Sequence, residues 1–351
     1  MIPIRDVEII APNFKKRLSG VTSTIIQLIP VQRALGQKIA TLGPGLPADL
    51  PHIRFRDLLQ LWTPPPGRKN RVWHARRNLE MLPAIILRDL LRMKLKIAFT
   101  SASQRRHTGW TKFLVGRMDA VIATSDKTAA YLEVQSTTIL HGIDTRRFFP
   151  PADKTAAKTA LGLPGDKKIA GCFGRVRHQK GTDLFVDSMI ALLPARPDWI
   201  AIIAGRATGP HQGFEDELKQ KVSKAGLSDR ILFVGEHANI PDWYRTLDLF
   251  IAPQRWEGFG LTPLEAMATA VPVIATDVGA FSELLTTGET ETGILIAANL
   301  AAMTTAAASL MDDQPRRTRA AERGLRRATE AFSIEGEAQK LGAVYEKLLA
   351  V

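Results

Sequence analysis

Cysteine is nearly absent from this sequence of 351 residues, because Cys172 is the only one. A single cysteine excludes an intrachain disulfide framework and fits a reducing compartment. Cys172 lies in the apolar run 169–173. We therefore expect a buried structural thiol at this position rather than a catalytic nucleophile.

Long hydrophobic runs are also missing. No stretch approaches the roughly 20 consecutive apolar residues that a membrane-spanning helix needs. Met1 is followed at once by the polar stretch 5–8, so no signal peptide is visible. These two absences predict a cytoplasmic protein.

Acidic residues are scarce in the first part of the chain. Residues 1–150 contain 24 Lys and Arg against 10 Asp and Glu, a net charge of +14, whereas residues 151–351 contain 23 against 25, a net charge of −2. The two parts add up to the +12 of the whole chain. Such an asymmetry predicts that the N-terminal half faces an anionic partner: a phosphorylated glycolipid, a membrane surface or a nucleic acid.

The second half of the chain alternates short apolar runs with helix-forming stretches. Strands separated by helices predict right-handed βαβ units and a parallel sheet covered on both faces, as in a Rossmann-like domain. Strands are expected at 168–173, 199–204, 230–234, 248–252 and 272–276, with helices at 183–193, 215–225, 241–246 and 261–269.

The first half repeats this alternation less regularly. The stretch 146–153 contains Pro150 and Pro151 and breaks both periodicities, so it predicts a domain boundary. We expect an N-terminal domain at 1–150, a second domain at 151–334 and a closing helix at 335–351. Within the first domain, strands are expected at 7–11, 37–42, 95–99, 119–123 and 137–140, and helices at 21–35 and 125–134.

A basic loop follows the expected strand 168–173. Gly174 leaves room for a ligand to approach the backbone, and Arg175 and Lys180 are five residues apart. An arginine fork and a lysine point charge can flank a diphosphate, and binding crevices in open α/β sheets lie at this edge. A solvated basic turn is the alternative interpretation.

A second loop, Glu257-Gly258-Phe259-Gly260-Leu261, follows the strand at 248–252 and leads into a helix that carries Glu265. Free backbone N–H groups at a helix start can hold phosphate oxygens or sugar hydroxyls. Glu257 can accept hydrogen bonds from a sugar, and Glu265 can bind ribose hydroxyls. The alternative is that Glu265 is only a carboxylate at the helix start that the helix dipole favours. Its apolar neighbours, however, predict a buried acid that needs a partner. The next loop, around Gly279, is interpreted as the wall of the site.

These residues resemble a known family. The set Gly174-Arg175…Lys180-Gly181, Glu257-x7-Glu265 and Gly279…Glu283 is similar to that of the retaining glycosyltransferases of family 4, which have the GT-B fold of two Rossmann-like α/β domains facing across a cleft. The likeness extends to His141-Gly142-Ile143-Asp144…Phe148 and to Ser19-Gly20 after the first strand.

The resemblance implies roles for the individual residues. Arg175 and Lys180 neutralise the diphosphate of a sugar donor, Glu257 and the backbone of Gly258, Phe259 and Gly260 hold the sugar, Leu261 holds the phosphates and Glu265 the ribose. Ser19 and Gly20 lie on the acceptor and phosphate side, where many members have two glycines. His107, after the strand at 95–99, looks like the family's histidine that faces the sugar; a surface histidine in a basic turn is the alternative.

Within the family, the sequence looks most like the mannosyltransferases of bacterial lipopolysaccharide core synthesis. This implies GDP-mannose as the sugar donor, an anionic glycolipid as acceptor, and a cytoplasmic protein that contacts the anionic inner membrane peripherally. The anomeric configuration of the sugar is expected to be retained, through attack by the acceptor on the same face with the help of the leaving phosphate. No Asp-x-Asp stands on a strand-end loop, and the other six histidines lack ligand spacing, so we expect no metal and no cofactor.

Other functions compete with this interpretation. A UDP- or ADP-sugar could replace GDP-mannose, and a non-catalytic nucleotide-sugar-binding protein would carry the same loops. A dinucleotide oxidoreductase needs Gly-x-Gly-x-x-Gly after a strand, and Pro44 and Pro47 spoil the nearest approach. Nucleic-acid binding has only charge in its favour, because aromatic-bearing binding motifs are absent.

The region 64–112 combines basic clusters with an apolar stretch at 82–91. Together with Trp73, this pattern suits an interfacial helix on anionic lipid. The alternative is a core-facing amphipathic helix with a solvated basic side. Pro83 is expected to interrupt any continuous helix.

Overall fold

The computed structural model describes residues 1–16 and 20–350 and divides them into two α/β units. The first unit runs from Met1 to Gly142 and includes the helix α13 (Ile334–Ala350), and the second is Ile143–Ser333. The division falls before the boundary expected at residue 150. The reason is that Ile143 already pairs with the far end of the second unit, where its backbone N–H donates to Phe332 at 2.8 Å.

The first unit is built on a parallel sheet of seven strands in the order β3-β2-β1-β4-β5-β6-β7. Its strands are β1 (Ile9–Pro12), β2 (Ile39–Leu42), β3 (His52–Ile53), β4 (Arg71–Ala75), β5 (Leu95–Ser101), β6 (Ala120–Ala123) and β7 (Thr137–Thr138). Its helices include α1 (Gly20–Ala34), α2 (Asn78–Ile85), α3 (Gly109–Val115) and α4 (Asp126–Ala129), together with the shorter turns η1 (Ile4–Asp6), η2 (Phe55–Gln60) and η3 (Ile86–Leu90).

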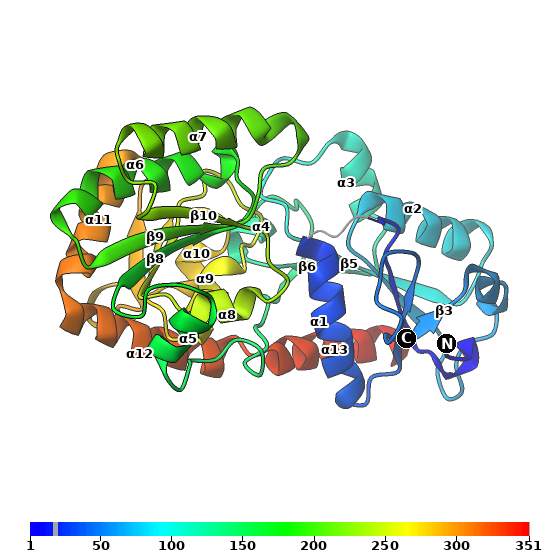
Figure 1. The fold of residues 1–351 in the computed structure, drawn as a ribbon. Helices are drawn as coiled ribbons and strands as arrows, with labels where there is room; N and C mark the ends of the chain where they lie inside the picture. Colours follow the sequence, from blue (N-terminus) through cyan, green and yellow to red (C-terminus); the bar gives the residue numbers. More distant parts are fainter. Residues whose placement is uncertain (17–19, 351) are drawn as a thin grey trace. The chain divides into compact units, whose positions relative to one another are not determined.

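Helices cover both faces of this sheet (Figure 1). On one face, α1 and α13 pack together, and Ile25, Leu28 and Leu341 lie in one buried cluster. On the other face, α2, α3 and η2 enclose a second cluster around Trp73. Burial on both faces explains why the central strands read as nearly continuous apolar runs.

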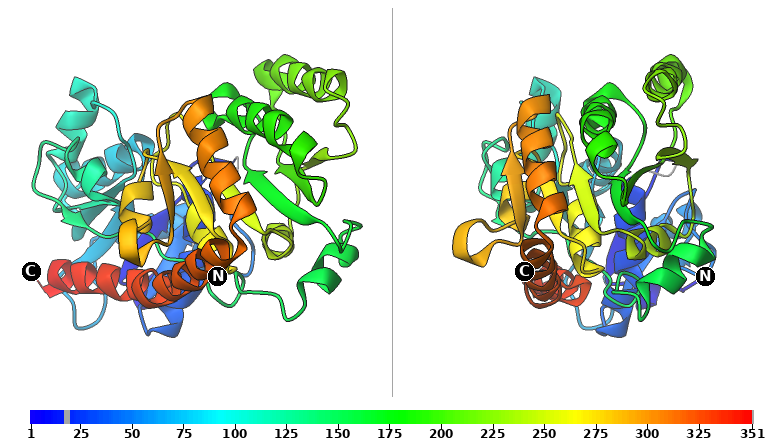
Figure 2. Two further views of the ribbon diagram at one scale, coloured as in Figure 1. Left: turned by 90° about the vertical axis from the view of Figure 1, so that its left-hand side faces the viewer. Right: turned by 60° about the vertical axis from the view of Figure 1, so that its left-hand side comes forward.

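The second unit has six parallel strands in the order β10-β9-β8-β11-β12-β13. The strands are β8 (Lys168–Phe173), β9 (Trp199–Ala204), β10 (Ile231–Gly235), β11 (Leu249–Ala252), β12 (Val273–Thr276) and β13 (Gly293–Ile296). The helices are α5 (Lys154–Ala160), α6 (Thr182–Leu192), α7 (Gln212–Lys224), α8 (Ile240–Arg245), α9 (Thr262–Ala268), α10 (Phe281–Leu284), α11 (Leu300–Asp312) and α12 (Gln314–Ala331), with the short turns η4 (His178–Lys180), η5 (Leu193–Ala195), η6 (Gly209–His211) and η7 (Gly288–Thr290). Helices α6 and α11 pack side by side over one face of the sheet (Figure 2).

The expectation that Trp73 belongs to a membrane-facing basic group is wrong. Trp73 lies on β4, is fully buried and donates from Nε1 to the carbonyl of Glu80 at 3.0 Å. Arg71, two residues earlier, is buried as well. Its guanidinium donates to the carbonyls of Val7, Thr63 and Ile4 at 2.7–3.0 Å, and burial lowers its pKa to about 10.

The helix expected at 125–134 is much shorter in the structure. Ser125 forms its N-cap, since its hydroxyl accepts from the N–H of Thr128 at 3.0 Å. However, α4 ends at Ala129, and the N–H groups of Tyr131 and Leu132 donate only three residues back. Glu133 then has a φ of 51°, a left-handed conformation that ends the helical path.

Pro83 does not end the helix in which it lies. It is inside α2, and the chain continues directly into the π-helical turn η3. Proline removes one backbone hydrogen bond, and a wider turn restores the ladder beyond it.

Nowhere in residues 1–16 and 20–350 is a helix both long and apolar enough to cross a membrane.

Candidate active site

The candidate site of the second unit lies where its strand order reverses. The chain passes from β8 to β9 and β10 on one side and then returns to β11 on the other side of β8. The loops after β8 and β11 therefore leave the same edge of the sheet next to each other. In open parallel sheets, ligands bind outside the carboxyl ends of the strands at such a reversal.

Gly181 holds these two loops close together. It begins α6 with a φ of 70°, and a Cβ atom built there would lie 1.8 Å from the carbonyl oxygen of Pro253. Only glycine fits so close an approach at a left-handed position. The loop after β8 is thereby pressed against the loop after β11.

Arg255 ties the same two loops together by side-chain contacts. Its guanidinium donates to both carboxylate oxygens of Asp183 at 2.7 Å and to the carbonyl of His178 at 2.6 Å, while its backbone N–H donates to the carbonyl of Gln179. Burial alone raises the pKa of Asp183, but the paired arginine outweighs it and the pKa lies below its ordinary value. Neither Arg255 nor Asp183 was among the site residues expected from the sequence.

Three cations, Arg175, Arg177 and Lys180, lie around Glu257 in this crevice. Lys180 forms an ion pair with Glu257, and both side chains are largely buried. Arg175 is exposed nearby, and the Nε of Arg177 is buried with no acceptor among the described residues. Burial lowers the pKa of Arg177, the charge of Arg175 lowers it further, and Glu257 opposes both. The excess of positive charge suits a phosphorylated ligand. Arg177 was not among the site residues expected from the sequence.

Two glycines make the space that Glu257 occupies. A Cβ atom at Gly260 would lie 2.8 Å from Cγ of Glu257, and one at Gly279 would lie 3.1 Å from its Cβ. Both glycines have positive φ, 85° and 59°. The backbone N–H of Gly258 donates to Oε1 of Glu257 at 3.1 Å. Gly279, interpreted from sequence as a wall residue, therefore contacts the central acid directly.

The neighbouring residues of this loop differ in exposure. Phe259 is buried, and its carbonyl accepts from the N–H of Ala280 at 3.0 Å. Leu261 precedes α9, and its carbonyl accepts from the N–H of Glu265 at 2.9 Å. Gly258, Gly260 and Leu261 are half-buried, so their backbone can be reached by a ligand.

Glu265 has the partner that its apolar surroundings require. The hydroxyl of the buried Tyr244 donates to its Oε2 at 2.8 Å. Burial raises the pKa of Glu265, and Tyr244 and the charge of Arg147 oppose the shift. No described residue donates to Oε1, which leaves that oxygen available to a hydroxyl-bearing ligand.

Cys172 behaves as the sequence predicted. Its side chain is buried beneath the crevice at the end of β8, and burial raises the pKa of its thiol to about 12. A thiol with so high a pKa carries almost no thiolate near neutral pH, so it cannot act as the nucleophile.

The predicted residues of the first unit lie at the carboxyl edge of its own sheet. Gly20 is the exposed first residue of α1, and Ser19 lies outside the described residues. His107 stands on the loop between β5 and α3. Burial lowers its pKa, as do Arg105 and Lys112, against a smaller opposing effect of Glu133. Its Nε2 is buried with no partner among the described residues.

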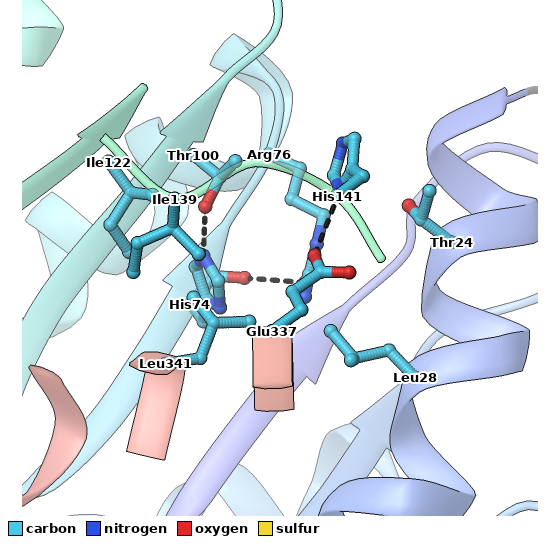
Figure 3. Close-up of a pocket in the computed structure, with 10 residues that line it drawn as sticks. All are labelled: Thr24, Leu28, His74, Arg76, Thr100, Ile122, Ile139, His141, Glu337 and Leu341. Atoms are coloured by element: carbon cyan, nitrogen blue, oxygen red, sulfur yellow. Dashed lines mark hydrogen bonds and ion pairs between the residues drawn. The ribbon is translucent and has the colours of Figure 1, made fainter. Parts of the chain in front are cut away.

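A buried polar cluster at this edge was not foreseen (Figure 3). His74 bonds the hydroxyl of Tyr345 through Nδ1 at 2.6 Å and that of Thr100 through Nε2 at 2.7 Å. Burial and the charge of Arg76 hold the pKa of His74 well below 6.5, so the ring is neutral. The polar residues at the strand ends could have indicated this cluster. Their partners on α13, however, are far along the chain, so the sequence pattern did not connect them.

Glu337 closes the same cluster and fixes the end of the first unit. Its two carboxylate oxygens accept from Nδ1 of His141 and from the backbone N–H of Gly142, each at 2.8 Å. The segment at 141–148 is thus anchored by α13 at its first two residues. Within residues 1–16 and 20–350, no three His, Cys, Asp or Glu side chains gather as metal ligands.

Comparisons with known proteins agree with this architecture. Residues 153–327 match the family model described as Glycosyl transferases group 1. The chain is 75% identical over 350 residues to the lipopolysaccharide core biosynthesis mannosyltransferase LpsB of Rhizobium meliloti (strain 1021), covering 99% of this chain and 100% of that protein. It is 57% identical to the corresponding LpcC of Rhizobium leguminosarum bv. viciae, covering 99% of both chains.

Among solved structures, Anabaena Alr3699/HepE in complex with UDP superimposes with a TM-score of 0.82 at 18% identity, covering 97% of this chain and 100% of that one. At this identity the likeness shows the fold alone. The expectation of a GT-B fold with two parallel-sheet α/β domains is confirmed.

Proposed function

This chain belongs to the glycosyl transferases group 1 family and is a glycosyltransferase, and we propose that it transfers mannose from GDP-mannose to the lipopolysaccharide inner core. The observation that carries the proposal is 75% identity, over essentially the whole length of both chains, to a lipopolysaccharide core mannosyltransferase. The relative at 57% identity has the same named activity.

The crevice at β8 and β11 supports a nucleotide-sugar as the substrate. Arg175, Arg177 and Lys180 offer positive charge where a diphosphate would lie, and Glu257 offers a carboxylate for the sugar hydroxyls. The free oxygen of Glu265 suits a ribose hydroxyl. As the bond between C1 of the sugar and the diphosphate breaks, charge develops on the leaving oxygen, and fixed cations stabilise that charge.

We expect the anomeric configuration to be retained. In the proposed step, the acceptor hydroxyl oxygen attacks C1 on the face from which the diphosphate departs. Its proton passes to the leaving phosphate oxygen, so atoms and charge balance without a covalent enzyme intermediate. The pairing of Glu257 with Lys180 supports this, because a carboxylate bound to a cation is a weaker nucleophile.

The acceptor is proposed to be an anionic glycolipid on the cytoplasmic face of the inner membrane, which the protein contacts peripherally. The net charge of +14 over residues 1–150 supports an anionic partner for the first unit. His107, whose Nε2 is buried with no partner in residues 1–16 and 20–350, is proposed to face the transferred sugar. Gly20 and Ser19 are proposed to lie on the acceptor side.

The test is a transfer assay with purified protein and a core acceptor, offering GDP-mannose, UDP-glucose and ADP-glucose in separate reactions. Transfer from GDP-mannose alone, with the configuration of the donor kept in the product by NMR, is the expected result. Transfer from only a UDP- or ADP-sugar would reject the proposed donor, and an inverted centre would reject the same-face step.

A matched pair of variants separates an enzyme from a nucleotide-sugar-binding protein. Glu257→Gln should remove most transfer while the protein still binds GDP. Glu236→Gln is the control, since Glu236 is an exposed glutamate on the surface of the second unit. If neither the parent protein nor the control transfers any sugar although GDP binds, the binding-protein alternative holds.

A further inference from the structure

Large apolar side chains are exposed along one helical segment of the first unit. Leu79, Leu82, Ile86 and Leu90 are between 38% and 74% exposed. Their spacing of three, four and four residues places them on one side of α2 and η3. The core side of the same segment is apolar too, because Met81 and Ala84 are buried. A surface helix in water normally has a polar outer side.

This outer side continues onto neighbouring elements. Asn78, the first residue of α2, donates to the hydroxyl of Thr111 on α3 at 2.7 Å, and Figure 1 shows α2 and α3 as neighbours. On α3, the rings of Trp110 and Phe113 are stacked with centroids 5.7 Å apart, and both are more than half exposed.

At the other end of the segment, η2 and the residues that follow it carry further exposed apolar side chains. The indole Nε1 of Trp62 donates to the carbonyl of Leu91 at 2.7 Å. Trp62 and Leu91 are both exposed, as are Phe55 and Leu59 on η2. We call the exposed apolar side chains of η2, α2, η3 and α3 the apolar surface. Exposed apolar side chains gathered on neighbouring elements in this way mark an interaction site.

The charges around the apolar surface that form no ion pair with a described residue are positive. Each of the four acids between residues 54 and 119 has an ion pair with an arginine: Asp57 with Arg54, Glu80 with Arg77, and Asp89 and Asp119 with Arg88. In contrast, Arg56, Arg92 and Lys94 are exposed and form no ion pair with any described residue. Arg92 has a φ of 52°, a conformation that favours glycine, directly after Leu91.

We propose that the apolar surface docks on an anionic lipid bilayer, with the outer side of α2 and η3 and the Trp110–Phe113 pair entering the headgroup region and Arg56, Arg92 and Lys94 binding lipid phosphates. Apolar and aromatic side chains beside free cations are the combination that interfacial membrane binding requires. The proposal deepens the function above and rests on it for the choice of a lipid surface as partner. The apolar surface includes Leu82, Ile86 and Leu90 from the stretch 82–91 that the sequence pointed to, whereas the buried Trp73 takes no part in it.

The test is co-sedimentation of the full-length protein with vesicles of phosphatidylcholine alone and of an equal mixture with phosphatidylglycerol. We expect clearly stronger binding to the anionic vesicles. Arg92→Gln with Lys94→Gln should weaken it about fivefold for each cation removed. Arg323→Gln with Arg326→Gln is the control of equal charge change on the exposed side of α12, and it should change binding much less.

The apolar part is tested by Leu82→Glu, Ile86→Glu and Leu90→Glu combined, at positions exposed enough to leave the fold intact. Vesicle binding should fall at least about tenfold, while the exposed Leu300→Glu on α11 should leave it nearly unchanged. Equal binding to both vesicle types, or an equal loss in Leu300→Glu, would overturn the proposal. So would self-association of the parent protein that the triple variant abolishes, since the surface would then join two copies.

Failure of the membrane proposal and failure of the proposed function give different results. The triple variant should still bind GDP and transfer sugar to a detergent-dispersed acceptor at the parent rate. A protein that binds anionic vesicles but transfers no sugar would leave the surface standing and reject the function. A protein that transfers sugar but does not bind vesicles would reject the membrane proposal and leave the proposed function standing.

Discussion

The hydroxyl of Tyr244 donates to Oε2 of Glu265 at 2.8 Å, within a set of aromatic rings that includes Phe173 and Phe250. This contact satisfies one oxygen of an acid whose pKa is raised by burial. No donor to the other oxygen, Oε1, is found in the described part of the chain, and the proposed function assigns it to a ribose hydroxyl. The tyrosine therefore sets how the acid faces the crevice.

Replacing that tyrosine should weaken both the fold and nucleotide binding. Tyr244→Phe leaves a buried carboxylate oxygen unpaired, which should lower the free energy of unfolding by about 1–3 kcal/mol. It should also raise the dissociation constant for GDP. Denaturant unfolding and calorimetric titration measure the two effects. Tyr131→Phe, at an exposed tyrosine, is the control, and equal behaviour of the two variants would contradict the assignment.

Lys180 should be essential for turnover. Lys180→Met removes the cation that pairs with Glu257 and, in the proposed function, one that stabilises the leaving diphosphate. A fall in kcat/KM on the order of a hundredfold to a thousandfold is expected. Lys168→Met is the matched control, because Lys168 pairs with Asp198 at the start of β8 rather than in the crevice. A rate unchanged in Lys180→Met would remove this lysine from the mechanism.

Arg255 should matter through the loops that it joins. Arg255→Lys keeps the charge but loses the two-pronged pair with Asp183. We expect a stability loss of about 1 kcal/mol and a raised KM for the sugar donor. Arg196 forms a similar fork with Asp312 elsewhere in the second unit. Arg196→Lys should therefore lose similar stability with an unchanged KM, and a KM shift in both variants would argue against a local effect.

The buried His74 should make the protein less stable in mild acid. Its pKa is lowered by burial and by Arg76 to well below 6.5, so below pH 6.5 the unfolded chain binds a proton that the folded chain does not. The free energy of unfolding should fall as the pH drops, by up to about 1.4 kcal/mol per pH unit from this group. His74→Gln should flatten that slope. Tyr345→Phe keeps the buried imidazole of His74, so it should lower the free energy of unfolding while leaving its pH slope in place. A pH slope unchanged in His74→Gln would contradict the assignment of the slope to His74.

Transfer is expected not to require a divalent metal. The crevice presents Arg175, Arg177 and Lys180 where, in the proposed function, the diphosphate lies. Activity after dialysis against EDTA should equal that of the untreated protein, and added Mg²⁺ or Mn²⁺ should not raise it. Loss of activity on chelation that one of these metals restores would contradict metal-independent transfer.

Several features of the site were predictable because they depend on local pattern and sheet topology. Strand-end loops of a parallel sheet meet at one edge, so Lys180 and Glu257 could be expected together although 77 residues separate them. The need of Glu265 for a partner followed from its apolar neighbours. Which residue supplies that partner did not follow, because Tyr244 lies on another helix and no periodic pattern marks the pair.

Other features escaped the sequence because the decisive contacts are distant. The basic residues around β4 read as solvated, yet Arg71 is buried by carbonyls of Ile4, Val7 and Thr63. Those acceptors belong to backbone turns that composition does not reveal. Helix propensity favoured 125–134, but the left-handed Glu133 ends that path. Local preference was overridden in both places by the tertiary fold.

The helix α13 has a consequence for how the chain is made. Its Ile334, Leu341 and Tyr345 complete the core on one face of the first sheet, beside Ile25 and Leu28. During translation, residues 1–142 therefore emerge without the segment that covers this face, while 143–333 emerge as an uninterrupted unit. The second unit can fold on the ribosome first, whereas the first unit is incomplete until α13 has been synthesised. A deletion within residues 334–350 should thus destabilise the fold of residues 1–142, far away in the sequence.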